Sequence, residues 1–204
     1  MSHTASLTVA LAALAYLVGS IPFGLLLTKA VAGRDVRRAG SGNIGAANVS
    51  RVAGYPAAVA VLILDAVKGL IPVLLGRTLG LEAWELALVG GIAVIGHDFS
   101  IFLRLRGGKG IATTVGVALG LLPPAGLIVA VIWLVILGIF RISSAASIIA
   151  TLLLPVVIAI LDGPAEYVAL TFGLALLALY THRDNLLRLS RGAEQGTGRA
   201  AGRD

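Results

Sequence analysis

The sequence predicts an all-α integral membrane protein with seven transmembrane helices, an N-terminus outside the cell and a C-terminus in the cytoplasm. The composition, the spacing of apolar runs and the placement of basic residues lead to this prediction. Of the 204 residues, 58% are hydrophobic and 13% are charged, whereas a soluble domain carries about 25% charged residues. Water cannot solvate so much apolar surface, so lipid is the expected solvent of the chain.

Seven apolar runs supply the expected helices. A bilayer core about 30 Å thick needs about 20 helical residues, and the fourth and fifth runs are shorter than this. Joined, they would be too long for one ordinary span, and Pro123-Pro124 near their junction would clash with the preceding helical turn. A hairpin is therefore predicted at this point. The seven runs are Ala5–Thr28, Val52–Leu75, Leu86–Leu103, Ile111–Leu122, Ala125–Phe140, Ser144–Leu161 and Tyr167–Tyr180.

The basic residues set the predicted orientation. With the N-terminus outside and seven crossings, 14 of the 16 lysines and arginines fall in cytoplasmic segments, in agreement with the positive-inside rule. Of the remaining two, Arg77 falls outside and Lys68 falls within a span. Six crossings would place Arg141 and the arginine-rich C-terminus outside as well, so seven crossings are preferred.

The composition also limits the domain organisation and the chemistry. Residues 1–191 are expected to form a single membrane domain, and residues 192–204 a disordered cytoplasmic tail. The chain has no cysteine, which excludes disulfides, thiol catalysis and cysteine-bound metal. The net charge of +6 comes from residues that flank membrane spans, so no nucleic acid partner is expected. No Lys or Arg precedes the first run, so no cleaved signal peptide is expected.

A glycine-rich segment, Gly40-Ser-Gly-Asn-Ile-Gly45, follows the first predicted span. Such a loop can expose consecutive backbone N–H groups as a nest for an anion, and Arg51 could add a bidentate contact to phosphate. A solvated loop with snorkelling arginines is the alternative. The segment also matches the dinucleotide fingerprint G-x-G-x-x-G. Charged residues rather than a hydrophobic strand precede it, however, so a nucleotide-binding βαβ unit is rejected.

A second glycine-rich segment, Arg104-Leu-Arg-Gly-Gly-Lys-Gly110, leads into the short fourth run. A short helix that starts at this Gly-Gly-Lys loop would direct its N-terminal amides and the positive end of its dipole at a bound anion. The segment is not a P-loop, because Gly110 follows Lys109 where Ser or Thr should hold magnesium. A basic turn that serves only membrane topology is the alternative.

Two further polar groups fall at the same predicted face. Ser144 could donate to a phosphate, although Ser143 or Ser144 could instead cap the sixth helix. His182 and Asn185 are three residues apart, so they share a helix face if the seventh helix continues through them. The alternative is a histidine that favours a helix C-terminus, followed by solvated residues. Together with the two loops, these residues indicate several anion sites at one membrane face.

Other ionisable residues lie deeper in the spans. Asp65 and Lys68 are three residues apart, and their pairing would offset the cost of about 2.5–3.5 kcal/mol that each carries alone at mid-membrane. His97-Asp98, near the inner end of the third run, could be catalytic or structural. The sequence has no G-x-S-x-G elbow and no evident nucleophile–base pair. Several anion sites without a nucleophile would suit two phosphorylated substrates.

Five motifs in order give the chain a family resemblance. It resembles the bacterial acyl-phosphate:glycerol-3-phosphate acyltransferase family, known as PlsY, from about Gly19 to Gly192. The motifs together are specific, although each alone would be weak. They are Gly19-Ser-Ile-Pro-Phe-Gly24, Gly40-Ser-Gly-Asn-Ile-Gly45, Asp65-Ala-Val-Lys-Gly69, Gly107-Gly-Lys-Gly110 and His182-Arg-Asp-Asn185.

This resemblance implies a multi-pass enzyme of the bacterial cytoplasmic (inner) membrane whose active site faces the cytoplasm. The implied reaction moves an acyl group from a fatty acyl phosphate to the sn-1 hydroxyl of glycerol 3-phosphate, which gives 1-acyl-glycerol 3-phosphate for phospholipid biosynthesis. No cofactor and no metal are implied. The implied partners are these two substrates and membrane lipid, with a functional link to an acyl-phosphate-forming enzyme and to a second acyltransferase.

The resemblance also assigns residues to roles. Lys109, Arg51 and Ser41 are the expected catalytic residues. Ser41 belongs to a loop expected to hold acyl phosphate, with Gly40, Gly42 and Asn43, and Gly107 and Gly108 should let backbone amides approach a phosphate. Glycerol 3-phosphate should contact Arg51, Lys109, Ser144, His182 and Asn185.

Three positions depart from the family pattern. Ala47 stands where threonine is common, Ile142 stands where tyrosine is usual, and Gly192-Ala-Glu194 lacks the usual threonine. As no side chain is an obvious base, the donor's phosphate is the hypothesised proton acceptor. The acyl chain is expected between helices or toward lipid. The competing hypothesis is a small membrane transporter for an anionic solute. It is disfavoured because no internal repeat is visible and the motifs lie at one face rather than at the midplane.

Overall fold

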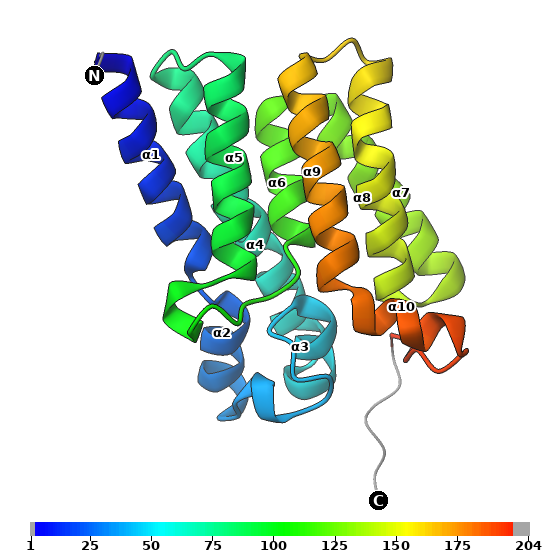
Figure 1. The fold of residues 1–204 in the computed structure, drawn as a ribbon. Coiled ribbons are helices and arrows are strands. Elements are labelled where there is room, and N and C mark those ends of the chain that lie inside the picture. The colour runs from blue at the N-terminus through cyan, green and yellow to red at the C-terminus, as the bar shows by residue number, and fades with distance from the viewer. Residues whose placement is uncertain (1–2, 198–204) are drawn as a thin grey trace, which may run out of the picture.

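Helices make up the described part of the chain, residues 3–197 of a computed structural model, and this part contains no β-strand (Figure 1). The all-α class predicted from the sequence is confirmed. The α-helices are α1 (His3–Ser20), α2 (Phe23–Ala32), α3 (Ala46–Ala53), α4 (Tyr55–Thr78), α5 (Ala83–Asp98), α6 (Ile111–Leu121), α7 (Pro123–Phe140), α8 (Ser143–Ile160), α9 (Ala165–Thr181) and α10 (Arg183–Ser190), and the short 3₁₀ helices are η1 (Val36–Arg38) and η2 (Ile101–Leu103).

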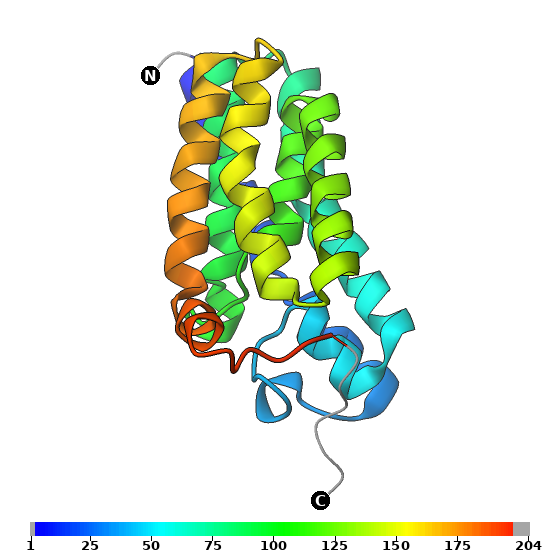
Figure 2. The same ribbon diagram turned by 90° about the vertical axis from the view of Figure 1, so that its right-hand side faces the viewer.

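Each predicted apolar run contains one main helix of the bundle. These helices are α1, α4, α5, α6, α7, α8 and α9, of which α6 is short. Figures 1 and 2 show that these helices run between two ends of the molecule, with α2, α3 and α10 gathered at one of them. The connections α4–α5 and α8–α9 lie at the other end, beside the N-terminus. The loops that carry the predicted polar motifs therefore lie together at one end of the bundle.

Two of the predicted runs are interrupted. The first is predicted to continue to Thr28, but α1 and α2 are separate helices on either side of Ile21-Pro22, because proline lacks the backbone donor that a continuing helix needs. The second is predicted to begin at Val52, which instead lies in α3. Gly54, with φ 84°, separates α3 from α4 in a conformation that favours glycine. Both breaks turn the chain at the end of the bundle that carries the polar motifs.

The predicted hairpin between the fourth and fifth runs is confirmed. Helix α6 ends at Leu121 and α7 begins at Pro123, whose missing N–H costs nothing in the first turn of a helix. The two helices approach closely at Gly126, where an added Cβ would lie 2.6 Å from the backbone nitrogen of Leu119. The start of α6 thereby points back toward the end of the bundle where the polar motifs gather.

Helix length and composition bear on the number of membrane crossings. Five helical segments of the described chain are long and apolar enough to cross a membrane, and a sixth is added if α9 and α10, bent by 63°, count as one span. Helix α6 has 11 residues, about 16 Å of helix, which is short for a span. Seven crossings therefore remain a proposal, whereas a bundle of apolar membrane helices is observed.

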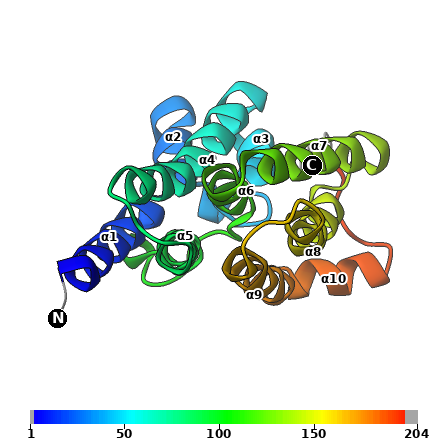
Figure 3. The same ribbon diagram turned by 90° about the horizontal axis from the view of Figure 1, so that it is seen from above.

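Helices α4 and α6 pack closely, and Figure 3 shows them side by side. A Cβ at Gly69 would lie 2.3 Å from the carbonyl oxygen of Thr113, and one at Gly116 would lie 1.8 Å from that of Ala66. Only glycine permits such close backbone approach, which is typical of membrane helix pairs. Helix α4 thereby fixes the position at which α6 begins.

The glycine-rich segment after α2 is packed against the bundle. A separate hydrophobic cluster joins α2, η1, α3 and the start of α4, and its innermost side chains, those of Val36, Val49 and Val61, are fully buried. The alternative of a loop free in solvent is therefore excluded. The larger core of the bundle, formed by α1 and α4–α9, is separate from this cluster.

Candidate active site

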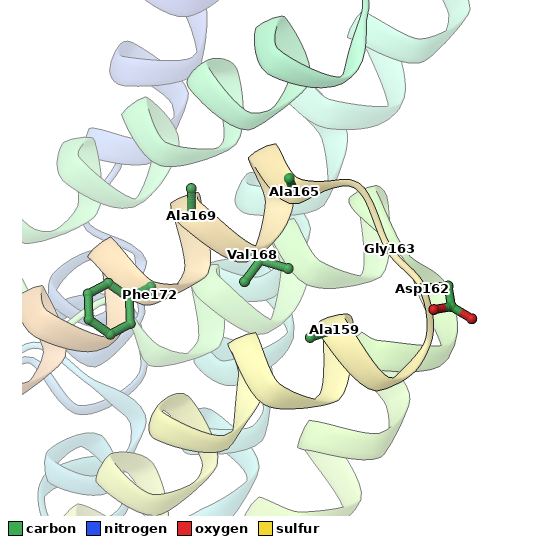
Figure 4. Close-up of a pocket in the computed structure, with 7 residues that line it drawn as sticks. All are labelled: Ala159, Asp162, Gly163, Ala165, Val168, Ala169 and Phe172. Carbon is green, nitrogen blue, oxygen red and sulfur yellow. The ribbon is translucent and has the colours of Figure 1, made fainter.

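One cavity of about 1670 Å³ opens at the end of the bundle where α2, α3 and α10 gather. A smaller cavity of about 610 Å³ lies at the other end, between α8 and α9, and its lining consists of small and apolar residues with a single carboxylate, that of Asp162, at the edge (Figure 4). Residues that can bind an anion line the larger cavity only. All the site residues expected from the sequence are among its walls: Gly40, Ser41, Gly42, Asn43, Arg51, Gly107, Gly108, Lys109, Ser144, His182 and Asn185.

Asn48 organises the first glycine-rich loop. Its Nδ2 donates to the carbonyl oxygens of Val36, Ala39 and Asn43 at 2.9–3.0 Å, and its Oδ1 accepts the amide of Ser41 at 2.9 Å. A buried polar side chain with all its hydrogen-bonding groups satisfied rigidifies the segments that it joins. The loop is therefore held in one conformation from inside.

The same hydrogen bonds occupy part of the expected nest. The amide of Ser41 is bonded to Asn48, that of Gly42 to Ala39, and that of Gly45 to the side chain of Asn43. An anion nest in this loop therefore stays a prediction that concerns its other amides. The loop also contributes Ser41, which is exposed, to the wall of the cavity.

Arg51 supplies a cation beside this loop. It lies in α3 and lines the cavity, and its Nε is buried without a hydrogen-bond partner among the described residues. An unpartnered buried donor is unfavourable, and an anion in the cavity would satisfy it. Arg51 is thus a candidate phosphate ligand on structural grounds as well as by motif.

The second glycine-rich loop is fitted onto the last turn of α5. The amide of Gly107 donates to the carbonyl of Asp98 at 2.9 Å, and the amide of Gly108 donates to the carbonyl of His97 at 3.1 Å. The amides of these two glycines are thus already bonded, and the expectation that the glycines let backbone amides approach a phosphate stays a prediction. The packing of the loop also requires glycine, since an added Cβ would lie 1.9 Å from the carbonyl oxygen of His97 at Gly107 and 2.0 Å from its Nε2 at Gly108.

The expected short helix does begin at this loop. Gly110 is the N-cap residue of α6, with φ 68°, and its carbonyl accepts the amide of Thr114 at 2.7 Å. The amides of the first turn have no acceptor inside a helix. Ile111 and Ala112 line the cavity, so these amides and the positive end of the helix dipole are placed to meet an anion.

Lys109 reaches across the cavity from this loop to α10. Its Nζ donates to Oδ1 of Asn185. Burial lowers the pKa of the Lys109 ammonium, and the positive charge of Arg188 lowers it further, although Glu194 and Asp184 oppose this effect. His182 lies beside this pair at the start of α10, and its Nδ1 donates to the carbonyl of Ala178 at 2.9 Å because a carbonyl can only accept.

The segment 192–197, which follows α10, crosses the mouth of the cavity. Oε1 of Glu194 accepts from Ser144 Oγ at 2.8 Å and from Asn185 Nδ2 at 2.5 Å, and Oε2 accepts from Arg188 Nε at 2.6 Å. Burial alone would raise the pKa of Glu194, but these hydrogen bonds outweigh it and lower the pKa below its usual value. Ser144 does not cap α8, whose N-cap residue is Ile142.

These contacts fall within the segment that was expected to be a disordered tail from residue 192. The structure describes that segment as far as Thr197, whose amide donates to the carbonyl of Arg141 at 2.6 Å. The rest of the expected tail, residues 198–204, lies outside the described residues.

The cavity has a second, apolar half. It lies between α4, α6 and α7, which stand next to one another in Figure 3. Trp133 is its largest side chain, and the indole Nε1 is satisfied by Ser147 Oγ of α8 at 3.1 Å, so the ring presents carbon to the cavity. The other apolar lining residues are Tyr55, Ala58, Val59, Leu62, Ile63, Ala66, Val115, Ala130, Leu134 and Leu137.

The arrangement suits a substrate with both an anionic and an apolar part. Unpaired or weakly paired cations and helix amides occupy one half, and hydrocarbon occupies the other. Among residues 3–197, no three His, Asp or Glu side chains come together as a group able to hold a metal ion.

Comparison with known proteins is consistent with this geometry. The family model described as "Glycerol-3-phosphate acyltransferase" matches residues 9–192. The chain belongs to the glycerol-3-phosphate acyltransferase family. Curated members from Myxococcus xanthus and Rubrobacter xylanophilus are 45% and 43% identical to it, over 93% and 96% of this chain and 99% and 98% of their own.

Solved structures of this family have the same fold. The crystal structure of PlsY (YgiH), an integral membrane glycerol 3-phosphate acyltransferase in its glycerol 3-phosphate form, superposes with a TM-score of 0.89 at 37% identity, over 94% of this chain and 96% of that one. The lysophosphatidic acid form superposes with a TM-score of 0.84 at 36% identity, over 93% and 94%. The resemblance inferred from five motifs is thus confirmed.

Two residues that shape the site of this family member are missing from the sequence-based list. Asn48 lies only three residues past the glycine-rich loop, and a polar residue in an otherwise apolar turn of α3 was a usable signal. Glu194 belongs to the segment Gly192-Ala-Glu194 that was compared with the family pattern, but its composition alone resembles a solvated tail, so no role was assigned to it. Its contacts depend on residues 9 and 50 positions away.

Proposed function

We propose that this chain transfers a fatty acyl group from acyl phosphate to the sn-1 hydroxyl of glycerol 3-phosphate and releases 1-acyl-glycerol 3-phosphate. Membership of the family makes it a glycerol-3-phosphate acyltransferase. The observation that supports the finer assignment is the two-part cavity, with cations and helix amides in one half and hydrocarbon in the other. Both an acyl phosphate and the product have this division into phosphate and chain.

Glycerol 3-phosphate is assigned to the part of the cavity between Lys109 and α10. Ser144 and Asn185 already donate to a carboxylate there, that of Glu194, so they have the geometry to donate to a phosphate. Lys109 and His182 lie alongside, and Arg51 adds the unpartnered guanidinium nitrogen. PlsY was solved in a glycerol 3-phosphate form and in a lysophosphatidic acid form.

The acyl phosphate is assigned to the two glycine-rich loops and the apolar half. The loop Gly40–Asn43 contributes the hydroxyl of Ser41, and the first turn of α6 contributes its free amides. The acyl chain would lie between α4, α6 and α7, against Trp133. The phosphate of the donor and that of the acceptor would then share the cations Arg51 and Lys109.

The reaction follows from this arrangement. The glycerol oxygen attacks the carbonyl carbon of the donor, the bond from that carbon to the phosphate oxygen breaks, and the hydroxyl proton passes to the donor's phosphate. No side chain of the cavity is needed as a base. Placing both substrates can lower the barrier by roughly 7–11 kcal/mol, and each preorganised donor to the developing charge adds about 2.7–4 kcal/mol.

The proposed location is the bacterial inner membrane, with the cavity open to the cytoplasm. The cavity lies at the end of the bundle that carries Arg37, Arg104 and Arg188, as the positive-inside rule predicts for a cytoplasmic face. Donor and product chemistry then require two further enzymes, one that forms the acyl phosphate and one that acylates the second hydroxyl.

A direct assay tests the donor. Purified protein in detergent should convert palmitoyl phosphate and glycerol 3-phosphate to 1-palmitoyl-glycerol 3-phosphate, and palmitoyl-CoA should not replace the acyl phosphate. Equal rates with palmitoyl-CoA, in a preparation free of acyl-phosphate-forming enzymes, would refute the assigned donor. In vesicles, labelled glycerol 3-phosphate should appear in lipid. Its accumulation unmodified would support a transporter instead.

A further inference from the structure

Four buried ionisable side chains lie beneath the loop that carries Lys109, and the proposed reaction uses none of them. Asp65, Lys68, His97 and Asp98 are 3%, 2%, 4% and 5% exposed. Asp65 and Lys68 come from α4, and His97 and Asp98 from the last turn of α5. Charged groups inside a membrane helix bundle are unfavourable unless they are paired, and they mark functional positions.

Lys68 anchors one side of this cluster. Its Nζ lies 2.8 Å from Oδ1 of Asp65 and donates to the carbonyl of Ile21 at 2.8 Å, and it stands 5.6 Å from the centroid of the Phe23 ring. The expected pairing of Asp65 with Lys68 is therefore confirmed. The pair also fixes the break between α1 and α2, because Ile21 lies in that break.

His97 lies between this pair and the glycine-rich loop. Its Nδ1 faces Oδ1 of Asp65 at 3.7 Å and makes no hydrogen bond within the described chain. The other edge of the ring contacts Gly108, where an added Cβ would fall 2.0 Å from Nε2. The imidazole thus fills the space between the buried ion pair and the residue that precedes Lys109.

We propose that His97, oriented by the Asp65–Lys68 pair, is the positioning residue that holds Lys109 in reach of the reacting phosphate. Two backbone hydrogen bonds, from the amides of Gly107 and Gly108, hold the loop against the end of α5. The ring of His97 sets the distance of the loop from α4. The proposal rests on the catalytic role assigned to Lys109 above.

An aliphatic side chain would fill this space at less electrostatic cost, since burying an imidazole whose Nδ1 is unbonded is unfavourable. An aliphatic residue would not, however, reproduce the flat ring of His97 or its approach to Asp65. Replacing His97 should therefore shift the loop rather than unfold the bundle, and a displacement of about 1 Å at a catalytic group can cost about 10²-fold in rate.

A double-mutant cycle between His97 and Lys109 tests the proposal. His97→Leu should lower kcat about 10²-fold with little change in KM for palmitoyl phosphate, whose chain occupies the other half of the cavity. In the Lys109→Ala background, the same replacement should cost no more than about twofold, because the group that it positions is gone. His97→Gln, which keeps a donor toward Asp65, should show the same loss and the same lack of additivity if His97→Leu does not fold.

Glu85→Gln is the matched control, since Glu85 is a buried polar residue at the far end of α5, 2% exposed and bonded to Thr8. It should lower the melting temperature, and any loss of rate should add to that of Lys109→Ala. If the loss of kcat in His97→Leu added fully to that in Lys109→Ala, or if His97→Leu lost no kcat, the role proposed for His97 would be overturned. The role assigned to Lys109 would not be affected. Near-wild-type turnover by Lys109→Ala would instead overturn the assigned role of Lys109 and with it the inference.

Discussion

Lys109 stands between two glycines at the point where the cationic half of the cavity meets α6. It is one of three lysines in a chain with 13 arginines, and its Nζ bridges to Asn185 of α10. A compact ammonium fits between phosphate oxygens where a planar guanidinium does not. We predict that Lys109→Ala and Lys109→Arg both lower kcat, Ala by about 10²–10³-fold, in an assay with palmitoyl phosphate.

The exposed Lys29 provides the matched control, because it lies in α2 and is not part of the cavity wall. Lys29→Ala and Lys29→Arg should keep wild-type turnover. If Lys109→Arg also did so, positive charge alone would be sufficient, and the loop would be assigned to membrane topology.

The hydrogen bonds of Glu194 predict how the stability of the fold depends on pH. Its carboxylate accepts hydrogen bonds from Ser144, Asn185 and Arg188, which lower its pKa in the folded protein. A group with a lowered native pKa stabilises the fold above its ordinary pKa of about 4.3, and this contribution is lost as the pH falls through the lowered native value. At pH 7, Glu194→Gln should lower the free energy of unfolding by about 1.5–3 kcal/mol, the range for hydrogen bonds to a charged group.

Chemical unfolding in detergent at several pH values measures this effect. The difference between wild type and Glu194→Gln should shrink as the pH is lowered below about 4.3. Gln195→Ala, at an exposed neighbour in the same segment, should match wild type throughout. A difference that stays constant down to the lowest pH would show that ionisation of Glu194 does not stabilise the segment.

At the scale of elements, the sequence predicted which segments are helical but not where each begins and ends. Apolar runs identify helices because lipid requires a continuous apolar surface, so all seven main helices of the bundle, the short α6 included, were found. The breaks at Pro22 and Gly54 were missed because the residues on both sides remain apolar. Hydropathy registers neither the backbone donor that proline lacks nor a φ angle that favours glycine. The hairpin at Pro123 was found because two prolines and an excessive length coincided.

The Gly107–Gly110 loop yields a prediction at the same scale. A Cβ at Gly108 would overlap the His97 ring, with 2.0 Å to Nε2, so Gly108→Ala must displace either the loop or the ring. We expect a loss of about 10²-fold in kcat with the fold retained. Gly138→Ala in α7, where an added Cβ meets nothing within 4 Å, should keep full activity. Equal turnover by the two variants would contradict the close fit of the loop on α5.

At the scale of the whole molecule, the site exists only because distant segments meet. The side-chain hydrogen bonds between Lys109 and Asn185, and between Ser144 and Glu194, join residues separated by 76 and 50 positions. No local pattern specifies such pairs, so the motifs alone indicated anion sites at one face, and the family resemblance supplied the residue set. It did not indicate that the amides of Gly107 and Gly108 bond to the end of α5, a contact that depends on the packing of the loop.

Orientation in the membrane is the remaining property of the whole molecule, and the concentration of arginines at one end of the bundle predicts it. If the chain crosses the membrane seven times with that end inside, Arg38→Cys and Arg191→Cys should resist an impermeant thiol reagent in intact cells and react after permeabilisation. Glu166→Cys, at the exposed start of α9, should react in intact cells. The absence of native cysteine removes background labelling. Because Arg38 and Arg191 are separated by every long helix from α4 to α9, an odd number of crossings between them would place one inside and the other outside. Labelling of Arg191→Cys but not Arg38→Cys from outside would therefore show that one of the helices between them, of which α6 is the shortest, does not cross, and would overturn the seven-crossing topology.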